Sequence, residues 1–182
     1  MQEERGVVER AQRGDAQAFS RLYEEYFEKI YRYIMIRVGS RVDAEDLTEQ
    51  VFLKVLESIA SFKWRGVPFS AWLFRIARNV VIDHLRKAKK GSLPLSESAS
   101  GGVDPALLAE KRLDIEQLNL ALEKLTQAQR EVVALRFAAG LSTAETGRAL
   151  GKSEGAVKAL QHSALVALRK RLAQWQGDEQ GI

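Results

Sequence analysis

Apolar residues recur at three- and four-residue intervals along most of the chain, which is the spacing of amphipathic helices. In the first half this pattern predicts a short helix over residues 7–13 and a long one over residues 16–38, with Asp15 as its N-cap. A third helix is expected to start at an Asp43 cap and to run to about residues 59–62. The sequence contains only three prolines among its 182 residues, which agrees with long uninterrupted helices. We therefore predict an all-α fold.

The helix that follows Asp43 has two distinct faces at about 100° per residue. The apolar face is expected to be buried and consists of Leu47, Val51, Phe52, Val55 and Ile59. The other face is polar and acidic and consists of Asp46, Glu49, Gln50, Leu53 and Glu57. Such a face is either an ordinary solvated surface or a docking surface. The apolar Leu53 in the middle of the acidic row favours a docking surface for a basic partner helix.

The next segment is strongly basic and rich in aromatic residues. Residues 61–90 contain eight Lys or Arg and one acid, in a chain whose net charge is +4. Gly66 and Pro68 predict a loop over residues 63–69, and Ser70 is expected to cap a helix that runs to about Ala88. Cations beside flat rings suit single-stranded nucleic acid, although a solvated basic face with Trp72 half packed would look similar. The predicted contacts are Lys63, Trp64, Arg65, Phe69, Trp72, Arg75, Asn79 and Arg86.

A change of composition then separates two domains. Nine of the fifteen residues in 91–105 are Gly, Ser or Pro, which predicts a flexible linker between a domain over residues 1–90 and a second over residues 106–182. With such a linker, a free or inhibited form can pack the two domains together and hide both of their DNA-binding surfaces.

The second domain has the pattern of a helix-turn-helix. A helix over about residues 106–124 is followed by a capping box that opens a helix over 126–138. A second capping box opens a short helix over 142–150, and Ser153 is expected to cap a longer one to Arg171. An ordinary helical pair is the alternative, but the paired capping boxes favour a helix-turn-helix whose second helix enters the major groove.

Helical phasing assigns a reading face to this last helix. Small residues there would allow a close approach to the bases. The residues predicted to contact DNA are Lys158, Ala159, His162, Ser163 and Arg169.

Enzyme chemistry is not indicated. There is no cysteine, and the only two histidines, His84 and His162, fall in different predicted domains, so we expect no metal and no cofactor.

No apolar run is long enough to span a membrane, and the start of the chain does not have the pattern of a signal peptide. We therefore expect a cytoplasmic protein without membrane insertion.

Three segments in this order resemble the extracytoplasmic-function (ECF) sigma factors of the sigma-70 superfamily. The matching segments are DAEDLTEQVFLKVLES over 43–58, FKWRGVPFSAWLFRIARNVVIDHLRK over 62–87, and the long helix-turn-helix segment over 125–170. The resemblance implies that residues 1–90 are sigma domain 2 and residues 106–182 are sigma domain 4. The chain would then be a bacterial sigma factor that binds core RNA polymerase and directs promoter-specific initiation.

The resemblance also implies partners for each surface. The acidic face around Leu53 would dock on the clamp helices of the polymerase β′ subunit. The loop over 63–69 and the helix after it would melt and read the minus-ten element, capturing a flipped base. The second domain would read the minus-thirty-five element and contact the β flap, and an anti-sigma factor is expected as regulator. The alternatives are a stand-alone helix-turn-helix regulator and, less favoured, a helical enzyme.

Overall fold

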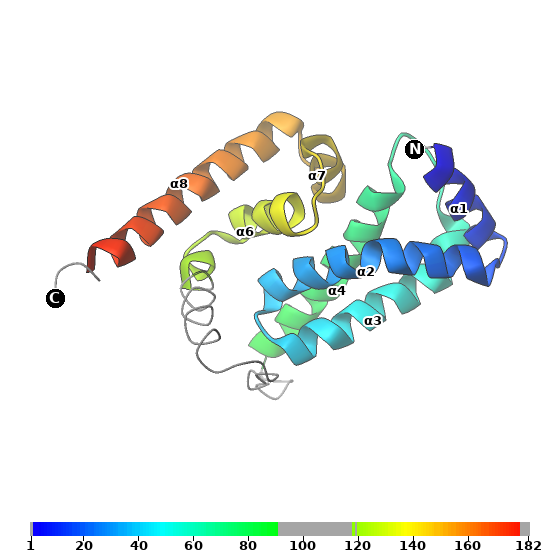
Figure 1. Ribbon diagram of the computed structural model, residues 1–182, viewed down its shortest axis with the longest axis horizontal. Coiled ribbons are helices and arrows are strands. Elements are labelled where there is room, and N and C mark those ends of the chain that lie inside the picture. Colours follow the sequence, from blue (N-terminus) through cyan, green and yellow to red (C-terminus); the bar gives the residue numbers. More distant parts are fainter. Residues whose placement is uncertain (1, 91–117, 119, 179–182) are drawn as a thin grey trace.

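The computed structural model describes residues 2–90, 118 and 120–178 (Figure 1). In the first half the helices are α1 (Gln2–Gln12), α2 (Ala16–Val38), α3 (Arg41–Ser58), a short 3-10 helix (Ile59–Ser61) and α4 (Phe69–Lys89). In the second half they are α6 (Gln127–Val133), a π-helical turn (Ala134–Ala138), α7 (Thr143–Leu150) and α8 (Glu154–Asp178). No strand occurs among these residues, and the all-α prediction is confirmed. The predicted linker and most of the predicted helix over 106–124 lie outside the described residues.

The caps of the first half agree only in part with the sequence prediction. The Asp15 cap is confirmed, because its Oδ1 accepts hydrogen bonds from the backbone N–H groups of the residues two and three positions later, at 3.0 and 3.1 Å. The Asp43 cap is wrong: α3 begins earlier, and the Oγ of Ser40 accepts from the Asp43 N–H at 3.3 Å. The Ser70 cap is also wrong, because α4 begins at Phe69 directly after Pro68 and has no side-chain cap. Helix α1 starts five residues before the predicted position.

Both predicted capping boxes are present in the second half. Thr126 and Gln129 form one at the start of α6, and Ser142 and Glu145 form the other at the start of α7. Helix α7 ends at Gly151, whose φ of 65° is in the left-handed region that favours glycine. Helices α7 and α8 therefore form the predicted helix-turn-helix, and α8 extends seven residues past the predicted end.

One hydrophobic core joins the two halves of the chain. Tyr33 of α2 and Phe74 of α4 lie in the same buried cluster as Leu135, Leu141 and Ala149 from the second half. Each large side chain that is fully buried there stabilises the fold by roughly 1.5–3 kcal/mol. In Figure 1, α6 and α7 lie beside α2 and α4, whereas α8 extends away from the first half. The two predicted domains are thus packed together.

A second, smaller cluster packs α8 against α6 and the residues just before α6. It contains Ala121, Leu122, Leu125, Val133, Ala164 and Leu168.

Within the part of the chain that the structure describes, no helix combines the length and the apolar character that a bilayer-spanning segment needs.

Candidate nucleic-acid and protein interfaces

The outer face of α3 is exposed as its sequence predicts. Asp46, Glu49, Gln50, Leu53 and Glu57 are all exposed, while the opposite face of the helix is buried in the core. Leu53 is 61% exposed, and Leu56, which the sequence analysis did not select, is 55% exposed beside it. The two leucines form a small apolar patch among carboxylates. Leu56 could have been found from the sequence, because it lies about 60° from Leu53 around the helix.

The basic-aromatic surface of α4 and the loop before it divides into exposed cations and packed rings. Among the residues predicted to contact DNA, those that are exposed are Lys63, Arg65, Arg75, Asn79 and Arg86. Trp64 and Trp72 are partly buried and pack against Phe62, with ring centroids 5.0 and 5.1 Å from its ring. The rings therefore form a rigid platform from which the cations project.

Phe69 was predicted to contact DNA, and its position in the structure corrects this prediction. Phe69 is fully buried, and its ring centroid lies 5.6 Å from that of Phe62 and 5.7 Å from that of Tyr26. The physical reason is the earlier start of α4, which places Phe69 one turn before the buried Leu73 on the inner face of the helix. Phe69 supports the platform from beneath and is not available for contact with DNA in this structure.

Helix α7 lies against this surface. The Oγ of Ser70 donates a hydrogen bond to Oε1 of Glu145 at 2.6 Å, and Nη2 of Arg75 donates to the backbone carbonyl of Arg148 at 2.8 Å. A cavity of about 640 Å³ separates the loop from α7, and Trp64 lines it from the loop side. The Nε1 atom of Trp64 is buried and has no hydrogen-bond partner. One predicted DNA contact, Arg75, is thus already engaged by the second half of the chain.

The Glu145 carboxylate is held in its charged form at this contact. Partial burial on its own would raise the pKa of Glu145, but hydrogen bonds from the side chains of Ser142 and Ser70 and from the Ser142 backbone outweigh it, so the pKa lies below its usual value of 4.5. A carboxylate in this position repels a phosphate backbone that approaches the loop.

The predicted reading face of α8 is open. Lys158, Ala159, His162, Ser163 and Arg169 are all exposed. Ser163 already has partners, since its Oγ accepts from Nε2 of Gln129 at 3.0 Å and donates to the Leu160 carbonyl at 3.0 Å. The expectation that a packed form hides both predicted DNA-binding surfaces is therefore wrong for α8. On α4 the packed form covers only part of the predicted surface, at Ser70 and Arg75, and the predicted cations there stay exposed.

Two buried charged residues, Arg37 and Glu131, and the partly exposed Arg78 were not predicted from the sequence. Nε of Arg78 lies 2.8 Å from Oε1 of the buried Glu131 and links α4 to α6. Arg37, near the end of α2, is also buried. The available signal was a charged residue within an apolar run, as for Arg37 between Ile36 and Val38.

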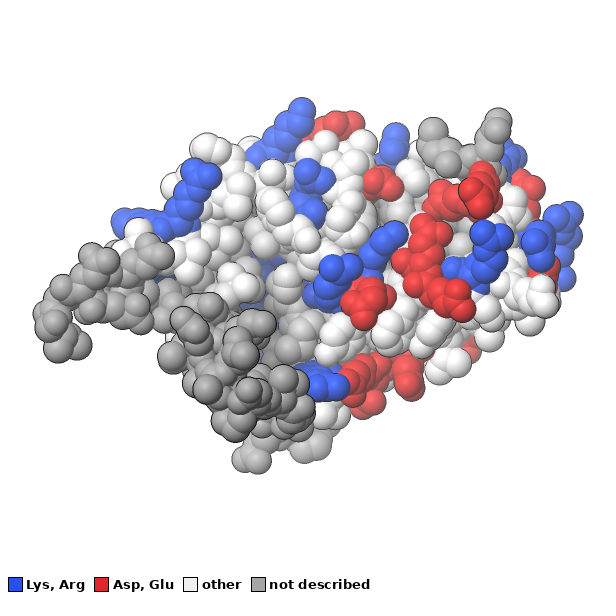
Figure 2. Space-filling view, in the orientation of Figure 1, with Lys and Arg blue, Asp and Glu red and all other residues white. Residues whose placement is uncertain are grey.

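Figure 2 shows acidic side chains gathered over α1 and the adjoining part of α2. Glu3, Glu4, Glu24 and Glu25 line a depression there together with Arg21. Glu4 also lines the cavity beside Trp64, so this acidic group lies next to the loop before α4.

Comparisons with known proteins show the family to which the chain belongs. Residues 22–91 match the Sigma-70 region 2 family, and residues 121–170 match the Sigma-70, region 4 family. The ECF RNA polymerase sigma factor BldN of Streptomyces coelicolor is 42% identical over 172 residues, which cover 91% of this chain and 64% of that protein. The ECF RNA polymerase sigma factor SigX of Bacillus subtilis is 33% identical over 168 residues, which cover 86% of this chain and 84% of that protein. The chain belongs to the ECF sigma factor family, whose members are transcription initiation factors.

Solved structures share the fold. CnrH, in a complex with the cytosolic domain of CnrY, superposes with a TM-score of 0.76 at 24% identity and covers 94% of this chain and 97% of its own. The sigma factor RpoE of Bartonella quintana, in a complex with the anti-sigma factor NepR, gives 0.69 at 24% identity and covers 87% of this chain and 98% of its own. At such identities the likeness concerns the arrangement of helices.

Proposed function

We propose that this chain binds core RNA polymerase and directs promoter-specific transcription initiation in the cytoplasm. One observation carries the proposal. Consecutive helices present an exposed acidic face centred on Leu53 of α3 and an exposed cationic face on α4 that includes Arg75 and Asn79. The first surface suits a basic protein partner and the second suits a nucleic-acid strand, so the polymerase and the melted promoter would be held side by side.

Each surface has a specific role in this proposal. The α3 face docks on the clamp helices of the β′ subunit. The loop before α4 and the exposed residues of α4 capture the minus-ten strand, for which the partly buried Trp64 and Trp72 supply stacking surfaces. The face of α8 reads the minus-thirty-five element, and the second half also contacts the β flap. Residues 1–90 act as sigma domain 2 and residues 106–182 as sigma domain 4.

The packed arrangement has a consequence for this function. Because Arg75 donates to Arg148 and Ser70 donates to Glu145, α7 occupies part of the surface that the minus-ten strand needs. We propose that the two halves separate when the polymerase binds. An anti-sigma factor that holds them together, or that covers α3, would keep the protein inactive.

The test is reconstitution with core polymerase. The purified chain is mixed with core enzyme and a library of promoter fragments, and polymerase-dependent transcripts are mapped. We expect weak duplex binding by the chain alone and defined start sites with the polymerase. Tight duplex binding alone without polymerase-dependent initiation would instead support the stand-alone helix-turn-helix regulator.

A further inference from the structure

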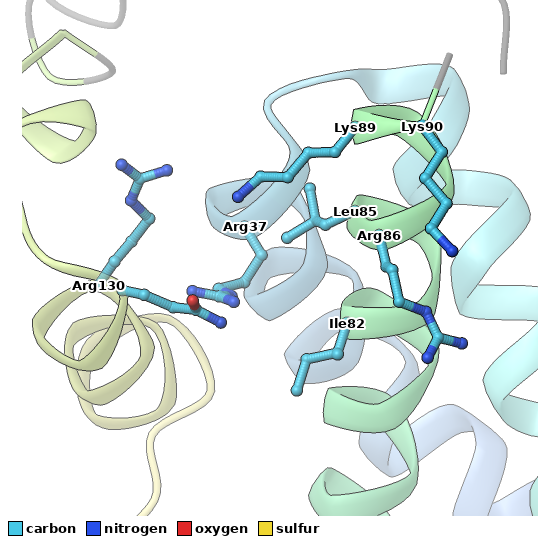
Figure 3. A pocket seen from close by; sticks show the side chains of 8 residues that line it. Arg37, Ile82, Leu85, Arg86, Lys89, Lys90 and Arg130 are labelled. Carbon is cyan, nitrogen blue, oxygen red and sulfur yellow. The ribbon is translucent and has the colours of Figure 1, made fainter. Parts of the chain in front are cut away.

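A cationic cavity of about 530 Å³ lies between the C-terminal ends of α2 and α4 and the helix α6 (Figure 3). The described residues that line it are Arg37, Ile82, Leu85, Arg86, Lys89, Lys90, Gln127 and Arg130, and none of these is acidic. In Figure 3, Lys89 extends across Leu85 toward Arg37, whereas Arg86 and Lys90 point to the other side of α4. The inner wall is therefore formed by the three cations Arg37, Lys89 and Arg130.

Arg37 is the unusual member of this group. Arg37 is only 4% exposed, and its Nε and Nη2 atoms have no hydrogen-bond partner. The Nε atom of Arg130 is likewise buried and without a partner, whereas its Nη2 atom donates to the Glu123 backbone carbonyl at 3.0 Å. A buried guanidinium that lacks a compensating anion is costly, and native structures normally satisfy such groups. The unpartnered nitrogens point to a ligand that supplies oxygen acceptors.

Within the described residues, the positive charge of the cavity is balanced only in part. Among the ion pairs of the described residues, Arg86 is matched by Asp83 at 3.1 Å, but Arg37, Lys89 and Arg130 have no carboxylate partner. Burial and the nearby Arg37 both lower the pKa of Arg130, and the attraction of Glu123 offsets this only in part. An anion between the two arginines would relieve their repulsion.

The geometry defines the chemical class of the anion. Arginine presents a planar fork of N–H donors that matches phosphate oxygens, and lysine adds a compact charge. The cavity is larger than a single phosphate requires, and three cations suit more than one negative charge. We propose that it binds a small anion that carries two or more phosphate groups, such as pyrophosphate or the phosphate chain of a nucleotide.

Such a ligand would bridge the two halves of the chain. Arg37 and Lys89 belong to α2 and α4, whereas Arg130 belongs to α6. An anion that contacts all three binds only when the halves are packed, so it stabilises the packed arrangement by mass action. The binding site itself goes beyond the proposed function, and it can be present whether or not the chain is active with polymerase.

The experiment is calorimetric titration of the full-length chain with pyrophosphate, ATP, orthophosphate and citrate at low ionic strength, together with thermal unfolding. We expect a single pyrophosphate per chain and a raised unfolding midpoint, with orthophosphate and citrate weaker by about tenfold. Equal affinity for pyrophosphate and ATP identifies the phosphate chain as sufficient, and tighter ATP binding shows that the nucleoside adds contacts. Binding of ATP without pyrophosphate, or citrate as tight as pyrophosphate, would overturn the proposal.

Matched variants locate the site. Lys89→Gln and Arg130→Gln each remove one cation from the wall, and we expect each to weaken pyrophosphate binding by about tenfold. Lys87→Gln removes an equal charge two residues away, on a side chain outside this cavity, and should change affinity by less than about twofold. Equal losses of pyrophosphate affinity in the Lys87 and Lys89 variants would show that binding is a general attraction to a basic surface. Arg37→Met tests the buried cation directly. If that variant does not fold, the comparison of Lys89→Gln with Lys87→Gln decides whether the cavity is the binding site.

Discussion

Arg78 of α4 and Glu131 of α6 form an ion pair across the contact between the two halves of the chain, with 2.8 Å between Nε and Oε1. The side chain of Glu131 is only 6% exposed, whereas that of Arg78 is 32% exposed. The carboxylate thus depends on one partner for its compensation. The pair is the buried part of a contact that the pairs Ser70–Glu145 and Arg75–Arg148 extend toward the surface.

Replacing Arg78 by Ala should separate the two halves. The change leaves the Glu131 carboxylate buried and unpaired, which costs on the order of 3 kcal/mol. We expect a larger radius of gyration in small-angle X-ray scattering and less protection of α6 amides from hydrogen exchange. Arg41→Ala is the control, because the Arg41–Glu45 pair is exposed and should contribute less than about 1 kcal/mol. If the two variants have the same radius, Arg78 does not hold the contact.

The contact should also weaken in acid through Glu145. Its pKa in the folded protein lies below 4.5, so its contribution is fully present above pH 4.5 and is lost as the pH falls through the lowered pKa. Glu145→Gln keeps a capping-box side chain but has no charge to lose. Between about pH 7 and about pH 3, the free energy of unfolding should therefore fall more steeply in the unmodified chain than in the variant. Parallel curves would show that Glu145 contributes nothing to the pH dependence.

Local patterns predicted the elements of this fold, although the caps at Asp43 and Ser70 were wrong. Long-range contacts account for the buried residues that these patterns missed. The faces of α3 and the two capping boxes depend on residues three to four positions apart, so the sequence was sufficient for them. Phe69 was misplaced because α4 begins earlier than the sequence predicts. The ring then packs in the core against Tyr26, which is distant in the chain. The roles of Arg37 and Glu131 depend on contacts between segments of the two halves, and no periodicity in the sequence encodes those contacts.

In the candidate site too, some features follow from local patterns and others depend on long-range contacts. Exposure of Leu53 followed from helical phase alone. The engagement of Arg75 by the Arg148 carbonyl could not be foreseen, because a backbone acceptor leaves no signature in the sequence.

Leu53→Asp should weaken binding to core polymerase. Leu53 is 61% exposed at the centre of the acidic face, and a carboxylate there removes the apolar anchor of the proposed interface. We expect a loss of about 1–3 kcal/mol in affinity, measured by fluorescence anisotropy, with unchanged thermal stability. Leu53→Met keeps the apolar surface and should bind nearly as well. Unchanged affinity in the Asp variant would exclude α3 as the docking surface.

Asn79→Ala should impair promoter melting more than duplex binding. Asn79 is exposed on α4, on the face where the minus-ten strand is proposed to lie, and its amide can hydrogen-bond a base edge. The expected loss is about 1–3 kcal/mol in open-complex formation, followed by permanganate reactivity of unpaired thymines. Filter binding of closed complexes provides the internal control. An equal loss in both measurements would argue against a role in melting.

Gly147→Ala should destabilise the helix-turn-helix. A Cβ atom at Gly147 would lie 2.6 Å from the backbone carbonyl oxygen of Lys152, in the turn between α7 and α8. Backbone cannot yield as a flexible side chain does, so the turn has to open, at a cost of about 1–3 kcal/mol. Gly155→Ala is the matched control on α8, since the nearest atom to its Cβ is the Ser153 Oγ at 4.0 Å. That change should be neutral or stabilising by up to about 1 kcal/mol, because Ala favours helix over Gly. Chemical denaturation of both variants measures the difference, and equal stabilities would mean that α7 and α8 do not approach each other as closely as Gly147 allows.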